Sequence, residues 1–124
     1  MEWKFNDELP IYQQIMSQIK YVIASGEWKA GDKLSSVREL AVEAGVNPNT
    51  MQKALSELER EGLLYSKRTA GRFVSDKGKS SEYLQEEIIM ECVKVFIEKM
   101  NKLGFSPEES VELLRKYVEK NEEE

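Results

Sequence analysis

The stretch LSSVRELAVEAGVNPNTMQKALSELEREGLLYSKRTAGRFV, residues 34–74, decides the fold of this chain. It opens with a helix signal at Ser36, because a Ser at the N-cap and Glu39 three residues later satisfy two amide donors that a helix start leaves unpaired. Gly45 supplies the left-handed backbone that ends a helix, and Val46 is placed to contact the apolar face of that helix. We therefore expect a short helix that begins at Ser36 and ends before Gly45.

A second helix is expected immediately after this turn. Asn47 is suited to cap it, and Pro48 takes the first helical position, where a missing amide hydrogen is harmless. Apolar residues recur at the i, i+3, i+4 and i+7 spacing of one helix face, at Met51, Ala54, Leu55 and Leu58. The opposite face is polar and carries Asn49, Thr50, Gln52 and Lys53.

The end of the stretch predicts a β-hairpin. Residues 63–68 are compatible with a strand, and residues 72–75 resume one after a turn at Thr69-Ala70-Gly71. Its tip carries the cations Lys67, Arg68 and Arg72, and the bare backbone of Gly71 can approach a sugar-phosphate closely. Two helices joined by a tight turn and followed by a basic hairpin are typical of a winged helix-turn-helix.

The polar face of the second helix suggests what such a fold would bind. Amide side chains such as Asn49 and Gln52 can bond adenine through two hydrogen bonds, and Lys53 can meet guanine or a phosphate. A helix inserted in the major groove uses its N-terminal residues to reach base edges, which is where these side chains cluster. Sequence-specific binding of double-stranded DNA is therefore the leading hypothesis.

At this point the chain resembles the GntR-type transcriptional regulators. The resemblance covers residues 10–75 in order, through the segments PIYQQI (10–15), GEWKAGDKL (26–34), SVRELA (36–41), GVNPNT (45–50), ALSELEREGL (54–63) and GRFV (71–74). It implies DNA contacts by residues of both helices and of the hairpin, namely Arg38, Asn47, Asn49, Thr50, Gln52, Lys53 and Gly71. The family also suggests a repressor. A homodimer would present two identical helices to the duplex, so the expected operator is an inverted repeat.

Three positions depart from the family pattern. The family often has Pro at position 35, a second Arg at position 52 and a Gly-x-Gly-Thr hairpin tip, where this chain has Ser35, Gln52 and Thr69-Ala70-Gly71-Arg72. These departures concern the base preference rather than the fold, because Gln cannot form the bidentate hydrogen bonds that Arg makes to guanine.

Composition agrees with a small regulator and excludes other classes. The 124 residues include no His and one Cys, which argues against a zinc site, a disulfide framework or His-based catalysis. The net charge of −5 is uneven, because residues 1–78 hold 11 cationic and 11 anionic side chains and residues 79–124 hold 7 and 12. Without an apolar run of membrane-spanning length, we expect a cytoplasmic protein with no cofactor and no metal.

The rest of the chain suggests how the DNA-binding domain is completed. We expect a mainly α-helical fold with a winged helix-turn-helix domain over residues 1–76, a polar linker over 77–81 and a helical hairpin over 82–124. The tail has more apolar surface than two helices can enclose, so a second copy is the expected partner. The residues expected to form this dimer surface are Leu84, Ile88, Cys92, Val95, Phe96, Met100, Leu103, Leu114 and Tyr117. The tail length resembles the short YtrA-type branch of the family, and no motif identifies an effector.

Two other classes of function were weighed. A winged helix can serve as a protein-protein adaptor, but such a module would lack the outward amides and the basic hairpin tip. An enzyme is disfavoured, because paired carboxylates such as Glu86-Glu87 and Glu108-Glu109 project in different directions from an exposed helix and have no base or pocket beside them.

Overall fold

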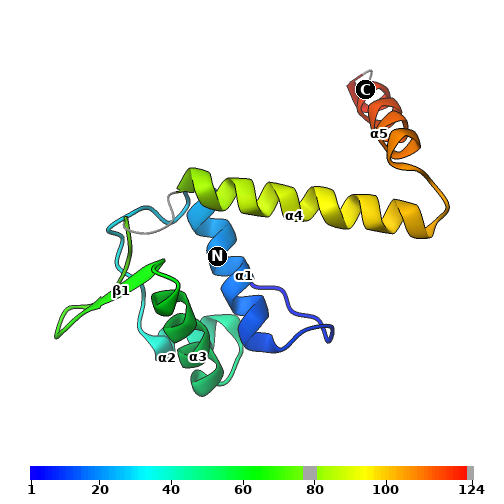
Figure 1. Cartoon of the computed structure of the whole chain (residues 1–124). Helices are drawn as coiled ribbons and strands as arrows, with labels where there is room; N and C mark the ends of the chain where they lie inside the picture. The colour runs from blue at the N-terminus through cyan, green and yellow to red at the C-terminus, as the bar shows by residue number, and fades with distance from the viewer. Residues whose placement is uncertain (77–80, 123–124) are drawn as a thin grey trace. The chain divides into compact units, whose positions relative to one another are not determined.

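The computed structural model describes residues 1–76 and 81–122, and within them it contains five helices and one antiparallel sheet of two strands (Figure 1). The elements are α1 (Ile11–Ala24), α2 (Val37–Ala44), α3 (Pro48–Arg60), β1 (Leu64–Lys67), β2 (Gly71–Val74), α4 (Ser81–Lys102) and α5 (Pro107–Glu122). The chain divides into two compact units, Met1–Glu86 and Glu87–Glu124. The mainly helical fold with a small hairpin is confirmed.

The helix boundaries follow the capping residues in the sequence. Ser36 Oγ accepts from the Glu39 backbone N–H at 3.1 Å, and a Glu39 carboxylate oxygen accepts from the Ser36 N–H at 3.3 Å. Gly45 ends α2 in the left-handed region with φ 72°. Asn47 Oδ1 then accepts from the Asn49 backbone N–H at 2.7 Å and caps α3. The predicted helix-turn-helix is therefore confirmed, including its tight turn.

The core of the first unit lies where α1 meets α3. Both helices turn fully buried apolar side chains inward, and α2 and the hairpin close the remaining sides of the core. The buried residues include Ile15, Ile19, Leu40, Met51, Leu55, Leu58, Leu63 and Val74. Burying a Leu, Ile or Met side chain contributes about 1.5–3 kcal/mol, so this contact dominates the stability of the unit.

Two glutamines on α1 fasten the ten residues that precede it. The Gln14 side chain donates to the carbonyls of Asn6 (2.9 Å) and Leu9 (2.7 Å), and it accepts from the Asn6 backbone N–H. Gln18 exchanges the same two kinds of hydrogen bond with the backbone of Lys4. The N-terminal segment is thus ordered along α1, which fixes the start of that helix.

The hairpin is held on α3 by one carboxylate. β1 and β2 pair in the register Tyr65↔Phe73 and Ser66↔Arg72, and Lys33 adds an isolated bridge to Phe73. Glu59 on α3 accepts a hydrogen bond from the Ser66 hydroxyl and contacts the Arg72 guanidinium at 3.5 Å. Because Ser66 and Arg72 face each other across the two strands, Glu59 fixes both strands to α3.

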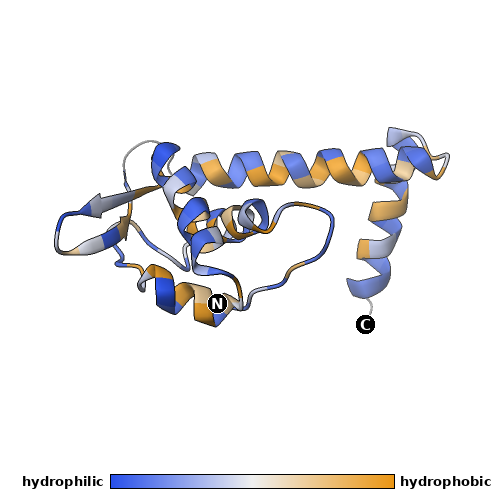
Figure 2. Ribbon diagram, turned by 90° about the horizontal axis from the view of Figure 1, so that it is seen from below, coloured by the Kyte–Doolittle hydropathy of each residue, from blue (hydrophilic) through white to orange (hydrophobic). Residues whose placement is uncertain are grey.

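The second unit consists of most of α4 and all of α5. α4 ends at a turn where Gly104 has φ 93°, and α5 begins with a reciprocal cap between Ser106 and Glu109. The Ser106 backbone N–H donates to the Glu109 carboxylate and lowers the pKa of that group, so this cap is lost as the pH falls through the lowered pKa. Both helices carry apolar residues along their length (Figure 2).

The tail differs from the expected arrangement in two respects. α5 leaves the turn at a wide angle to α4, so the two helices do not form the closed hairpin expected over residues 82–124 (Figure 1). Each helix has its own cap at the turn, which sets its direction independently. Ser81 already belongs to α4, and the other residues of the expected linker, 77–80, lie outside the described residues.

The carboxylate of Glu59 should matter more than that of its neighbour Glu57. In Glu59→Gln the Arg72 guanidinium, 15% exposed, loses its anionic partner, and we expect a loss of about 1–2 kcal/mol in the free energy of unfolding. Glu57 pairs with Arg60 on the surface, so Glu57→Gln should cost less than about 0.5 kcal/mol. Urea denaturation of both variants at one protein concentration makes the comparison. Equal losses in the free energy of unfolding would contradict the role of Glu59 in fixing the hairpin to α3.

Candidate nucleic-acid interface

The outward face of α3 is polar and accessible. Asn49, Gln52 and Lys53 are exposed, whereas Thr50 is half-buried and Asn47 is engaged in capping. Gln52 Nε2 donates to Ser56 Oγ one turn later at 3.1 Å, which holds its amide against the helix surface. The structure therefore places the amides expected to read bases on one surface, at the N-terminal half of α3.

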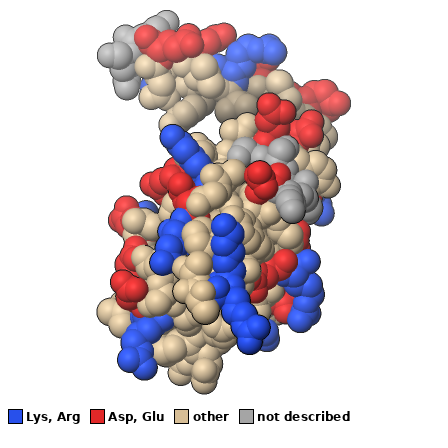
Figure 3. All heavy atoms as spheres, turned by 90° about the vertical axis from the view of Figure 1, so that its left-hand side faces the viewer, with Lys and Arg blue, Asp and Glu red and all other residues tan. Residues whose placement is uncertain are grey.

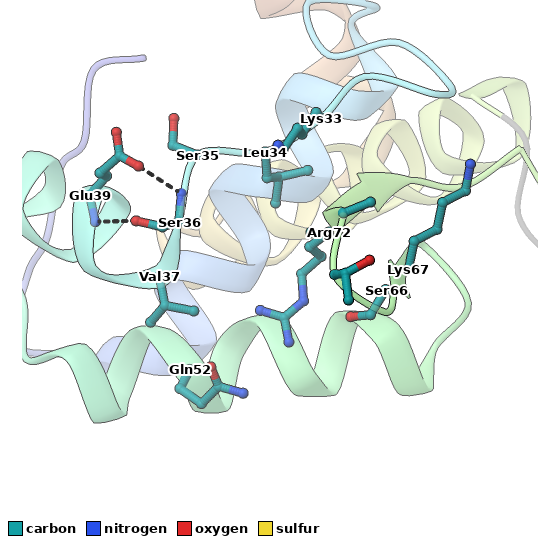
Figure 4. A pocket seen from close by; sticks show the side chains of 13 residues that line it. Lys33, Leu34, Ser35, Ser36, Val37, Glu39, Gln52, Ser66, Lys67 and Arg72 are labelled. Carbon is teal, nitrogen blue, oxygen red and sulfur yellow. Dashed lines mark hydrogen bonds between the residues drawn. The ribbon is translucent and has the colours of Figure 1, made fainter.

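A hollow of about 690 Å³ separates this surface from the hairpin. It is lined by the N-terminal end of α2 with the residues before it, by Gln52 of α3, and by Ser66, Lys67 and residues 69–72 of the hairpin. In Figure 4 Gln52 lies on α3 at the edge of the hollow, and the Lys67 side chain points away from it. The hollow therefore brings together the three segments to which the sequence assigned DNA contacts.

Cationic side chains gather on the side of the molecule that carries the hairpin. Figure 3 shows Lys and Arg along the middle of this face, with Asp and Glu mostly at its flanks. Lys67 and Arg68 are exposed at the hairpin tip, and Lys67 Nζ lies 5.3 Å from the centre of the Phe73 ring. Arg38 is exposed on α2. This local positive charge favours an anionic partner in spite of the negative total charge.

The sequence suggested that Arg72 is a free cation at the hairpin tip, but the structure shows that it is not. Its guanidinium points toward α3 and pairs with Glu59, and its Nε is buried without a hydrogen-bond partner (Figure 4). The reason is the strand register, which places Arg72 opposite Ser66 on the side of the sheet that faces α3. Its position assigns Arg72 a role in docking the hairpin.

The hairpin turn uses a non-glycine residue as well as Gly71. Thr69 has φ 72°, and Gly71 has φ 114° at the first residue of β2. A Cβ at Gly71 would lie 3.1 Å from Lys33 Cε, so a side chain there is disfavoured by the backbone conformation and by Lys33. Gly71 is exposed, and its bare backbone borders the hollow.

Two residues at this surface were missed in the sequence analysis. Lys33 lines the hollow beside Gly71 and bridges to β2, although it precedes α2 in the sequence. Tyr12, near the start of α1, has its ring 3.9 Å from Lys53 Nζ. Tyr12 lies on the apolar period of α1 with Ile15 and Ile19, which indicates packing, so only the tertiary arrangement reveals its contact with Lys53 and the place of Lys33 beside Gly71.

The residues expected at a dimer surface lie on α4, on α5 or, for Leu103, in the turn between them, and all but Leu84 are accessible in the single chain. Leu84 is 1% exposed, because the first turn of α4 belongs to the first unit, where the Gln85 side chain donates to the Ala24 carbonyl at 3.1 Å. Leu84 therefore offers no free surface to a second copy. The others are exposed or half-buried in the single chain: Ile88, Cys92, Val95, Phe96, Met100, Leu103, Leu114 and Tyr117.

In residues 1–76 and 81–122, no group of three or more acidic or Cys side chains is placed to hold a metal ion. No helix within these ranges combines the length and the apolar character needed to cross a membrane.

Known proteins resemble the chain over the elements just described. Its residues 11–74 match the family of bacterial regulatory proteins named gntR. It is 38% identical over 119 residues to YhcF of Bacillus subtilis, an uncharacterized HTH-type transcriptional regulator, covering 96% of this chain and 98% of YhcF. It is 49% identical over 72 residues to the transcriptional repressor YtrA of the same organism, covering 58% of this chain and 55% of YtrA.

Two solved structures extend the comparison. A GntR-family regulator from Listeria monocytogenes has a TM-score of 0.80 at 39% identity, over 90% of this chain and 98% of that one. The DNA-binding domain of AraR, solved in complex with an operator, has a TM-score of 0.56 at 32% identity, over 60% of this chain and 96% of that one. The names of these relatives are those of transcription regulators and not of enzymes. The family match over residues 11–74 spans both helices of the helix-turn-helix and the hairpin. This chain therefore belongs to the GntR family of bacterial regulatory proteins.

Proposed function

We propose that the chain is a sequence-specific DNA-binding transcription regulator of the cytoplasm, which acts as a repressor. The observation that carries the proposal is the exposed polar surface at the N-terminal half of α3, with the cationic hairpin beside it across the hollow. This arrangement lets α3 enter the major groove while the hairpin contacts the adjacent backbone. The operator-bound AraR domain and the repressor YtrA support it by similarity.

The proposed regulator acts as a homodimer through its tail. Large apolar side chains are exposed on α4 and α5, including Ile89 (56%), Val93 (47%) and Tyr117 (68%). Exposed apolar side chains gathered along a helix indicate an interaction site, and a second copy presents the same side chains. A two-fold dimer offers two copies of α3 to the duplex, so its operator is an inverted repeat.

The alternative, a winged-helix adaptor without DNA binding, is not favoured by the surface. An adaptor has no need of exposed amides at the start of α3 or of exposed cations such as Lys67 and Arg68 at the hairpin tip.

Selection from random duplex DNA tests the function as a whole. We expect enrichment of an inverted repeat whose half-site centres lie about 10 base pairs apart or a small multiple of that distance. A gel shift on the selected site should show one protein dimer per duplex. Absence of any enriched sequence would contradict the proposal, and a single asymmetric half-site bound at full affinity would contradict the dimer.

A charge on the apolar face of α4 tests the dimer in the full-length chain. Ile89→Asp should convert the dimer to a monomer in light scattering and weaken operator binding at least tenfold, because an unpaired carboxylate cannot be buried at low cost. Asn101→Asp adds the same charge at an exposed polar position of the same helix and should leave mass and affinity unchanged. A dimeric Ile89→Asp would place the interface elsewhere.

Substitutions of Arg38 and Gln52 should weaken DNA binding in different ways, which the dependence of affinity on salt concentration and on DNA sequence can distinguish. Arg38→Ala should weaken binding to all DNA and lower the salt slope by about 0.9 for each lost phosphate contact, twice per dimer. Gln52→Ala should cost roughly 1–3 kcal/mol per half-site on the selected operator and little on scrambled DNA, with an unchanged slope. Titrations of both variants on both DNAs at several salt concentrations decide this, and equal losses for Gln52→Ala on the two DNAs would mean that Gln52 only positions the helix.

A further inference from the structure

Tyr12 and Lys53 form a contact that joins α1 to the outward face of α3. Lys53 Nζ lies 3.9 Å from the centre of the Tyr12 ring, well within the range of a cation–π interaction. Lys53 is exposed one turn after Asn49, and Tyr12 is half-buried at the second position of α1. The contact therefore lies at the edge of the proposed DNA surface and not in the core.

Tyr12 accepts one side-chain hydrogen bond and is carried by a helix that is anchored in the core. The Gln13 side-chain amide donates to the Tyr12 hydroxyl at 3.3 Å. The segment before α1 is tied down by Gln14, and Ile15, one turn after Ile11, anchors α1 in the core. An aromatic ring on an anchored helix thus contacts the ammonium group of Lys53.

The physical consequence concerns the conformational entropy of Lys53. A free Lys side chain has about 2 kcal/mol of rotamer entropy, part of which is lost when its ammonium group is fixed on a phosphate. The Tyr12 ring interacts with one side of the ammonium group, which still has hydrogens to donate to an anion. Tyr12 therefore reduces the entropy that Lys53 loses on binding DNA without removing its charge.

We propose that Tyr12 is a positioning residue for DNA binding, which acts through Lys53. The proposal rests on the function proposed above and names a residue of α1, outside the helix-turn-helix and the hairpin. It differs from a direct contact, because the effect of Tyr12 must vanish when Lys53 is absent. It also differs from a contact made by the Tyr12 hydroxyl, because Phe at this position must suffice.

The test is a double-mutant cycle on the selected operator. Tyr12→Leu should weaken binding about two- to fivefold per half-site, because Lys53 then loses more of its rotamer entropy when it binds a phosphate. Tyr12→Phe should stay within about twofold of the wild type, since Phe keeps the ring. In the Lys53→Ala background, Tyr12→Leu should have no further effect. Tyr21→Leu, the same change at an exposed position of α1, is the matched control.

A readout without DNA separates the two proposals. In the free protein, the Tyr12 ring should shift the NMR signals of the Lys53 side-chain CH₂ groups upfield, and Tyr12→Leu should abolish that shift. The inference is overturned if the wild type binds its operator but Tyr12→Leu weakens binding equally with and without Lys53, or strengthens it. If the wild type shows the ring-current shift yet binds no DNA sequence, the proposed function fails and the role of Tyr12 fails with it.

Discussion

Burial of one face of α3 is the constraint on which the rest of the structure depends. Met51, Leu55 and Leu58 are at most 1% exposed, and α1 supplies Ile15 and Ile19 against them. This packing fixes the rotation of α3 about its own axis, so that the residues between the apolar positions must face outward. The outward positions carry polar side chains such as Asn49, Gln52 and Lys53, and these are groups that can recognise bases and phosphates.

The second requirement is a hairpin with a defined position beside α3. Glu59 meets it by engaging Ser66 and Arg72, one from each strand. Neutralising Arg72 in this way leaves Lys67 and Arg68 as the exposed cations of the hairpin. The surface proposed for DNA thus combines a helix and a hairpin in defined positions with a few exposed cations, which explains how a chain with a net charge of −5 can approach a polyanion.

Local signals made the first unit predictable. The capping box at Ser36, the left-handed Gly45 and the Asn47-Pro48 helix start determine backbone geometry within a few residues, and all three are found as expected. The roles of Arg72 and Tyr12 depend on strand register and on helix packing, which couple residues far apart in the sequence. Leu84 likewise follows the apolar stripe of α4 in the sequence but is buried in the first unit. An apolar period identifies a face to be covered without identifying what covers it.

Replacement of single purines by 7-deazapurines in the selected operator tests most directly whether α3 reads the major groove. The substitution removes the N7 acceptor of adenine or guanine, an atom that is exposed only in that groove. If α3 lies there, one or more purines in each half-site should show a loss of affinity of roughly 1–3 kcal/mol, at positions related by the two-fold axis of the operator. Full affinity at every substituted purine of both half-sites would contradict this mode of binding.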